Sequence, residues 1–166
     1  MNSLIFGNIL AFIGSAIMVA IGLVKNRNKI ILAQCAQFAF QGTANLVLGG
    51  TSGGIATLLS ILRNLICIKW KLNVPLKVVF SVIVAVPCLM SFNGILSLFP
   101  LISAIAFTWL LDVKSAVLLK TVIISTSCLW LIYDFSIKNY VAAAFDAFTI
   151  VSNTVGIFMV RKNGEQ

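Results

Sequence analysis

The chain has 166 residues, of which 60% are hydrophobic and only 10% are charged. A soluble domain carries about 25% charged residues, so this composition excludes an ordinary soluble fold and predicts an integral membrane protein. The formal net charge of +8 would suit a nucleic-acid partner. The basic residues gather in alternate loops, however, which is the pattern that marks the cytoplasmic side of a membrane protein. We therefore expect the lipid bilayer as a partner and no nucleic acid.

Seven apolar runs follow one another along the chain. A membrane-crossing helix needs about 17–25 residues, and the runs lack the alternation of polar and apolar residues that barrel strands show. They cover residues 4–24, 30–48, 54–70, 74–92, 94–111, 116–135 and 141–160. The sequence therefore predicts an all-α integral membrane protein with seven transmembrane helices, of which the third and fifth are short.

Ten of the twelve basic residues follow runs one, three, five and seven, and only Arg63 and Lys138 do not. The ten are Lys25, Arg27, Lys29, Lys69, Lys71, Lys77, Lys114, Lys120, Arg161 and Lys162. By the positive-inside rule, the N-terminus lies outside and the tail, residues 161–166, lies in the cytoplasm below a cell (inner) membrane. Aromatic residues suited to interfacial belts lie near the same boundaries: Trp70, Trp109, Tyr133 and Tyr140.

An internal repeat is predicted from the register of polar residues. Lys25 and Lys114 mark the first loop of each half and lie 89 residues apart. The same offset makes three pairs: Asn45 with Asp134, Asn64 with Asn153, and Gly50 with Asn139. It also pairs two polar trios with the spacing of one helix face: Thr57, Ser60 and Asn64, and Asp146, Thr149 and Asn153.

Parallel repeats joined by one inverting helix are a known transporter plan, with the solute site between the halves near the bilayer midplane. We therefore predict two parallel three-helix bundles, residues 1–72 and 94–160. A linker helix within residues 73–93 would join them. It would start at Pro75, behind Asn73 as a cap.

Four stretches carry a family resemblance: Lys25-Asn-Arg-Asn-Lys29, Gly49-Gly-Thr-Ser-Gly-Gly54 leading to Arg63-Asn64, Cys128-Leu-Trp-Leu-Ile-Tyr-Asp134, and Asp146-Ala-Phe-Thr-Ile-Val-Ser-Asn153. The plan resembles that of SWEET, PQ-loop and PnuC-type carriers. More closely, the chain resembles the YgjV-like family of bacterial inner membrane proteins. The SWEET resemblance implies that Asn64 and Asn153 line a solute pocket, although the hinge proline of its first bundle is replaced by Ala11.

Polar residues inside the runs form the candidate solute site. A carboxylate within a transmembrane helix, such as Asp146, is a functional-site hypothesis, against the alternative of a hydrated interfacial aspartate. Asn64 and Asn153 would bind hydroxyl or amide groups, or only fasten helices. Arg63 would extend to the surface, or pair with Asp146 or an anionic substrate. The predicted site comprises Asn64, Asn153, Asp146, Thr57 and Trp130, with Arg63 and Gln41 as further members.

Two other polar features have more than one interpretation. The stripe of Gln34, Gln37, Gln41 and Asn45 must face the bundle, either along a water-filled path or in buried helix contacts. The glycine-rich stretch Gly49–Gly54 lacks the Lys-Ser/Thr ending of a phosphate loop. It is interpreted as a tight turn capped by Thr51 or Ser52.

Enzyme chemistry has few residues to use. There is no histidine, and the four acids are Asp112, Asp134, Asp146 and Glu165. No Cys/His spacing suggests zinc, so we expect neither catalysis nor a cofactor or metal. The predicted function is transport or binding of a small polar solute. The alternative is an accessory or structural membrane subunit, and self-association into a homo-oligomer is left open.

Overall fold

The computed structural model describes residues 2–21, 27–70, 72–110 and 116–162. These residues form seven α-helices and one short 3-10 helix, with no strand among them, which confirms the all-α class. The helices are α1 (Ser3–Ile21), α2 (Arg27–Val47), α3 (Thr51–Lys69), α4 (Val74–Met90), η1 (Ile95–Leu98), α5 (Phe99–Leu110), α6 (Ala116–Ser136) and α7 (Tyr140–Lys162). Several residues used in the sequence argument lie outside the described ranges: Lys25, Lys71, Asp112, Lys114 and the end of the tail, 163–166.

Within the described ranges, no helix combines the length and the hydropathy needed to cross a membrane. Transmembrane insertion of the helices therefore stays a prediction from the sequence.

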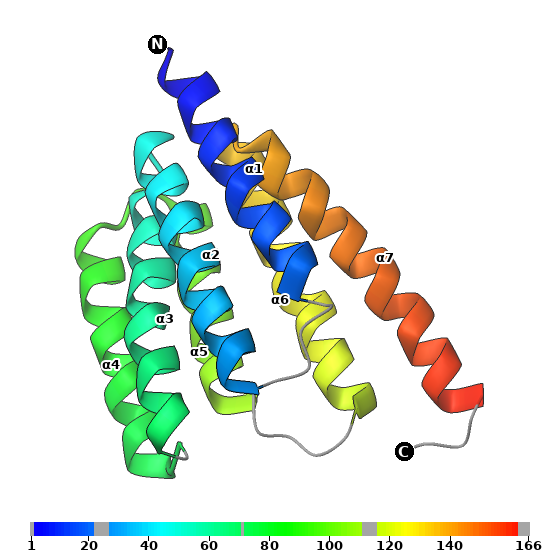
Figure 1. Cartoon of the computed structure of the whole chain (residues 1–166). Helices are drawn as coiled ribbons and strands as arrows, with labels where there is room; N and C mark the ends of the chain where they lie inside the picture. Colours follow the sequence, from blue (N-terminus) through cyan, green and yellow to red (C-terminus); the bar gives the residue numbers. More distant parts are fainter. Residues whose placement is uncertain (1, 22–26, 71, 111–115, 163–166) are drawn as a thin grey trace.

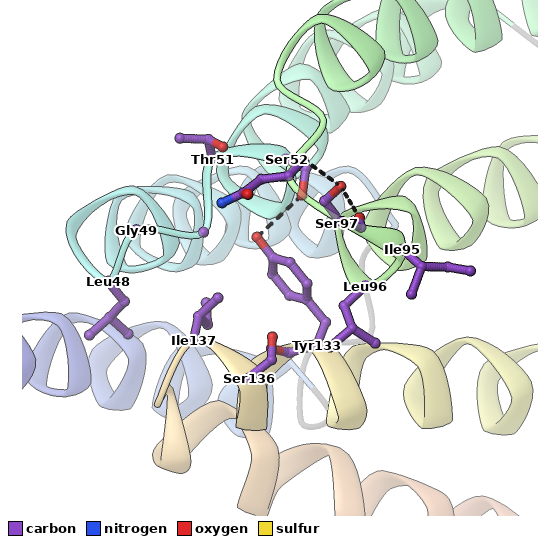
Figure 2. Close-up of a pocket in the computed structure, with 13 residues that line it drawn as sticks. Leu48, Gly49, Thr51, Ser52, Ile95, Leu96, Ser97, Tyr133, Ser136 and Ile137 are labelled. Atoms are coloured by element: carbon purple, nitrogen blue, oxygen red, sulfur yellow. Dashed lines mark hydrogen bonds between the residues drawn. The ribbon is translucent and has the colours of Figure 1, made fainter.

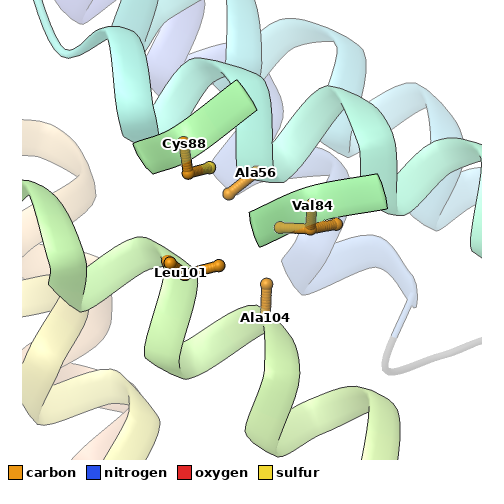
Figure 3. Packing of buried hydrophobic residues seen from close by; sticks show 5 residues of the cluster. All are labelled: Ala56, Val84, Cys88, Leu101 and Ala104. Carbon is orange, nitrogen blue, oxygen red and sulfur yellow. The ribbon is translucent and has the colours of Figure 1, made fainter. Parts of the chain in front are cut away.

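Six of the described helices form a closed ring. In order around it they are α1, α2, α3, α5, α6 and α7, and α7 packs back against α1. Helix α4 lies outside this ring and packs against α3 and α5 (Figure 1). Its Val84 and Cys88 meet Ala56 of α3 and Leu101 and Ala104 of α5 in a buried apolar cluster (Figure 3). Helix α4 thus covers the junction between α3 and α5.

Helix α4 begins at Val74, one residue before the predicted start at Pro75, and its cap is Asn73 as predicted. The side chain of Asn73 accepts a hydrogen bond from the backbone N–H of Leu76 at 3.1 Å, and Pro75 lies in the first turn. A proline is tolerated there because the first amides of a helix have no intrahelical acceptor. The division of the chain into residues 1–72, 73–93 and 94–160 remains a prediction.

The helix boundaries recur at the predicted offset of 89 residues. The end of α2 at Val47 matches the end of α6 at Ser136, and the start of α3 at Thr51 matches that of α7 at Tyr140. In the ring, α3 packs on α5 as α7 packs on α1. We call α1–α3 the first half and α5–α7 the second half.

The turns that join α2 to α3 and α6 to α7 have the same backbone. In the first turn, the N–H of Gly50 donates to the carbonyl of Asn45 at 2.7 Å. In the second, the N–H of Asn139 donates to the carbonyl of Asp134 at 2.8 Å. These residues are the pairs that the 89-residue offset predicts. The repeat is therefore present at the level of single hydrogen bonds.

The halves differ at the start of their first helices. The run over 94–111 was predicted as one helix, but the structure divides it into η1 and α5. Pro100 has no N–H to donate and its ring would collide with the carbonyl of Leu96 in a continuous α-helix. A 3-10 turn therefore precedes α5, and the prediction of a single helix is wrong.

The shared turn contains one left-handed residue in each half, Gly49 with φ 85° and Lys138 with φ 62°. A side chain there costs about 1–2 kcal/mol. We expect Gly49→Ala to lower the free energy of unfolding by about 1 kcal/mol. Lys138→Gly should raise it by up to about 1 kcal/mol. Unfolding of the purified protein in mild detergent measures both. Lys138→Ala keeps a side chain at the left-handed position, so it should leave the free energy of unfolding nearly unchanged. A Gly49→Ala variant with unchanged stability would contradict the shared turn.

Candidate functional site

A cavity of about 400 Å³ opens at the end of the bundle where α2 meets α3 and α6 meets α7 (Figure 2). Its walls come from residues 48–52, residues 93–97 and the end of α6. Among the described residues, no charged side chain lines it, and the polar side chains that do are Thr51, Ser52, Asn93, Ser97, Tyr133 and Ser136. Pockets of this size hold small molecules, and a few placed polar groups orient them. Neutral hydroxyl and amide groups suit an uncharged polar solute.

Tyr133 forms the wall of this cavity on the α6 side and is only 3% exposed. Its hydroxyl points across to the start of α3, where it accepts a hydrogen bond from the N–H of Gly53 at 2.9 Å and from Ser52 Oγ at 3.4 Å (Figure 2). First-turn amides have no intrahelical acceptor, and the N-cap, Gly50, has no side chain to supply one. Tyr133 therefore caps α3 from the other half of the ring.

This capping corrects two predictions. Neither Thr51 nor Ser52 caps the turn, because the N-cap position belongs to Gly50. Tyr133 does not lie in an interfacial belt, because its ring is buried against the start of α3, where a Cβ on Gly53 would overlap it. The two residues fit only because Gly53 has no side chain.

The start of α7 is capped in a corresponding way. Asn139 is fully buried, and its Oδ1 accepts from the N–H of Ala142 at 3.3 Å while its Nδ2 donates to Oδ1 of Asn45 at 2.9 Å. Asn8 of α1 accepts from the N–H of Val141 at 3.2 Å. Side chains from the opposite half therefore bind the first turns of both α3 and α7.

Two carboxyl groups meet between α6 and α7. Asp134 is 1% exposed, and its side chain is in hydrogen-bonding contact with that of Asp146, which is half-buried. Oδ1 of Asp134 has no hydrogen-bond donor among the described groups. Asp146 was a predicted site residue and Asp134 was not. The signal that points to Asp134 is its equivalence to buried Asn45 in the repeat.

Arg63 is buried and holds three helices together. Its Nε and Nη2 donate to Oδ1 of Asn64 at 3.3 and 3.1 Å, and its Nη1 donates to Oγ1 of Thr108 in α5 at 3.2 Å. Asn64 in turn donates to Oε1 of Gln34 in α2 at 3.5 Å. The side chain is 6% exposed, so the prediction that it extends to the surface is wrong. The predicted partner Asp146 instead contacts Asp134.

The two predicted asparagines are not brought together. Asn64 lies on α3 and Asn153 on α7, and these helices do not pack against each other within the described ranges. Asn153 is half-buried and donates to the carbonyl of Thr149 in its own helix at 2.9 Å. Neither lines the cavity, and the role of this pair as solute ligands stays a prediction.

The other predicted site residues do not line the cavity. Thr57 is buried and donates to the carbonyl of Gly53 at 2.8 Å. Trp130 packs edge to face on Tyr133, with 5.8 Å between the ring centroids. Gln41 lies against Gly14 of α1, so this part of the glutamine stripe makes a helix contact.

Residues 5–164 match the family model Imp-YgjV, described as a bacterial inner membrane protein. The match spans nearly the whole chain. Neither the curated proteins nor the solved structures include a match, so the likeness to the SWEET and PQ-loop plan stays a prediction.

The chain has only two tyrosines, which provide a matched test of the cap on α3. Tyr133→Phe leaves the N–H of Gly53 without its acceptor, and we expect the free energy of unfolding to fall by about 1–3 kcal/mol. Tyr140 is 51% exposed, so Tyr140→Phe should stay within about 0.5 kcal/mol of the parent. Thermal unfolding in detergent compares them. Equal effects would argue against capping by Tyr133.

The asparagines give a second matched pair. Asn64→Ala removes the acceptor of two Arg63 donors, and we expect a loss of about 1–3 kcal/mol in the free energy of unfolding. Asn153→Ala removes only a bond within α7 and should cost less than about 1 kcal/mol. Denaturant titration of both variants measures the difference. A larger loss of stability in Asn153→Ala than in Asn64→Ala would show that the Arg63–Asn64 hydrogen bonds do not stabilise the fold as proposed.

Proposed function

The chain belongs to the Imp-YgjV family of bacterial inner membrane proteins, and from this premise we propose that it binds a small uncharged polar solute at the Tyr133 cavity and carries it across the membrane. This family membership confirms the YgjV-like resemblance predicted from the sequence. The observation that carries the proposal is the neutral, hydroxyl-lined cavity whose walls come from both halves of the ring.

A membrane location for the ring is supported by where its apolar side chains lie. Large hydrophobic residues are exposed on the outside of the helices, among them Phe12, Val82, Phe148 and Phe158. Exposed apolar surface of this extent is unusual in water and suits contact with lipid. Polar side chains such as Asn45, Asn64 and Asp134 are instead buried, as the absence of water in the bilayer core requires.

The positive-inside rule gives the proposed orientation. The α2–α3 and α4–η1 connections carry no charged residue and the α6–α7 connection carries only Lys138. These three connections surround the cavity. Excess Lys and Arg mark cytoplasmic loops, so in the proposed orientation the cavity opens to the outside and the C-terminus is cytoplasmic.

Cavity chemistry narrows the class of solute. The hydroxyls of Thr51, Ser136 and Tyr133 both donate and accept, so they match alcohol and amide groups. A charged solute would need an opposite charge in the wall, and the described residues that line the cavity carry none. We therefore place polyols, sugars and small amides ahead of amino acids, amines and organic anions.

A structural or accessory role is the second candidate. It is favoured by the bonds that join the halves, such as Asn139 to Asn45 and Arg63 to Thr108. Bonds of this kind between membrane helices contribute about 0.6 kcal/mol on average. In that case the polar residues would only hold helices together, and no compound would bind the cavity.

Thermal unfolding of the detergent-purified protein with a panel of neutral and charged small compounds tests the solute proposal. A ligand that binds only the folded state stabilises it by about 2.7 kcal/mol at a hundredfold excess over Kd. We expect a shift from at least one uncharged hydroxyl or amide compound, and none from the charged ones.

Thr51→Val is the variant of choice, because Thr51 lines the cavity, is exposed and makes no side-chain hydrogen bond with any described residue. It should weaken the shift about tenfold in apparent affinity, as loss of one hydrogen bond of about 1.4 kcal/mol would. Thr121→Val, an exposed threonine of α6 remote from the cavity, should keep the shift in full. No shift with any compound would favour the accessory role.

A further inference from the structure

Asp134 and Asp146 are the only two carboxylic side chains in the described part of the chain, and they are in contact. An ionised carboxylate is only an acceptor of hydrogen bonds, so two of them cannot bond to each other. A protonated carboxyl donates through its O–H. The hydrogen-bonding contact between Asp134 and Asp146 therefore requires one proton.

The burial of Asp134 gives an independent reason for a bound ligand here. Its side chain is 1% exposed, and its Oδ1 has no hydrogen-bond donor among the described residues. A buried carboxylate without a hydrogen bond or counter-charge is strongly unfavourable. Buried polar atoms without a protein partner call for a bound ligand or water. A proton bound between Asp134 and Asp146 would meet this requirement.

Among the described residues, no positively charged group neutralises the pair. Helix α6 packs against α5, α7 and η1, and α7 packs against α1; α1, η1 and α5 contain no titratable side chain. Besides the two acids, the titratable groups of α6, α7 and their turn are Lys120, Cys128, Tyr133, Lys138, Tyr140, Arg161 and Lys162, and Cys88 of α4 lies near Tyr133. Arg161 and Lys162 end α7, about 22 Å along the helix axis from Asp146 at 1.5 Å per residue. Lys138 is exposed and forms no ion pair with either described carboxyl group.

We propose that Asp134 and Asp146 form a proton-binding site within the α6–α7 pair. In the loaded state, the acid O–H of one residue donates to the carboxylate of the other, and the pair carries a single negative charge. On release, that O–H bond breaks, the proton leaves to water and both residues are carboxylates. The electron pair stays on the oxygen, and two negative charges then face each other.

The site lies beside the cavity wall. Asp134 is next to Tyr133, and its backbone carbonyl holds the N–H of Asn139. Repulsion between two carboxylates would therefore act on the end of α6 that caps α3 and the start of α7. The proton site does not depend on the solute proposal; if both hold, the proton is the coupling ion.

The pH dependence of stability tests the site without any solute. The folded protein would bind one more proton than the unfolded chain, so stability is present at low pH and is lost as pH rises and the shared proton leaves. In that range the unfolding equilibrium constant should rise about tenfold per pH unit.

Asp134→Asn and Asp146→Asn should each remove this dependence. An amide N–H replaces the acid O–H as donor to the remaining carboxylate, and no proton is then exchanged. Lys138→Gln, which removes the nearest exposed cation in the turn, should keep the dependence in full. A slope that persists in both Asn variants would overturn the proposal.

Infrared difference spectroscopy of the folded wild type provides a readout that does not depend on unfolding. We expect the C=O band of a protonated carboxyl to persist above neutral pH and to be absent from either Asn variant that folds. Loss of the band at the pH where free carboxyls ionise would overturn the proposal. So would stabilisation by sodium ions that replaces the proton at high pH, because that would identify a metal-cation site.

Discussion

The fold depends on the starts of α3 and α7, where backbone amides face protein and not water. The first amides of a helix have no acceptor within the helix, and a buried amide without one costs about 1–3 kcal/mol. Each half meets this cost for the other: Tyr133 binds the amide of Gly53, and Asn8 binds that of Val141. The ring therefore closes at this end by hydrogen bonds that cross between the halves, and the cavity lies among the same residues.

The repeat keeps the backbone and changes the chemistry. At equivalent positions of the two turns, the first half has Gly50 and Asn45, and the second half has Asn139 and Asp134. The glycine end of α3 leaves room, and the tyrosine ring from α6 occupies part of it. The two halves therefore contribute differently to the cavity: the first half gives backbone and the hydroxyls of Thr51 and Ser52, and the second half gives the ring of Tyr133 and the hydroxyl of Ser136. The carboxyl pair does not line the cavity.

The sequence was informative where the signal lies within one helix or one turn. Apolar runs located the helices, the offset between Lys25 and Lys114 located the repeat, and Asn73 with Pro75 located the start of α4. It failed where the answer depends on which helices are neighbours. Burial of Tyr133 and the partner of Arg63 depend on the order of helices around the ring, which periodicity within one helix does not encode.

The requirement that buried polar atoms have hydrogen-bond partners also distinguishes residues that only join helices from residues that could bind a ligand. Thr57, Asn64 and Asn153 satisfy their hydrogen bonds within their own or neighbouring helices, so the protein alone accounts for them. Asn45 and Asp134 do not: Nδ2 of Asn45 and Oδ1 of Asp134 are buried without a partner among the described groups. They occupy equivalent positions in the two halves. Two unsatisfied polar atoms at one repeated position, a donor and an acceptor beside the same cavity-lining turns, are costly for stability. That cost argues for a ligand at this end of the ring.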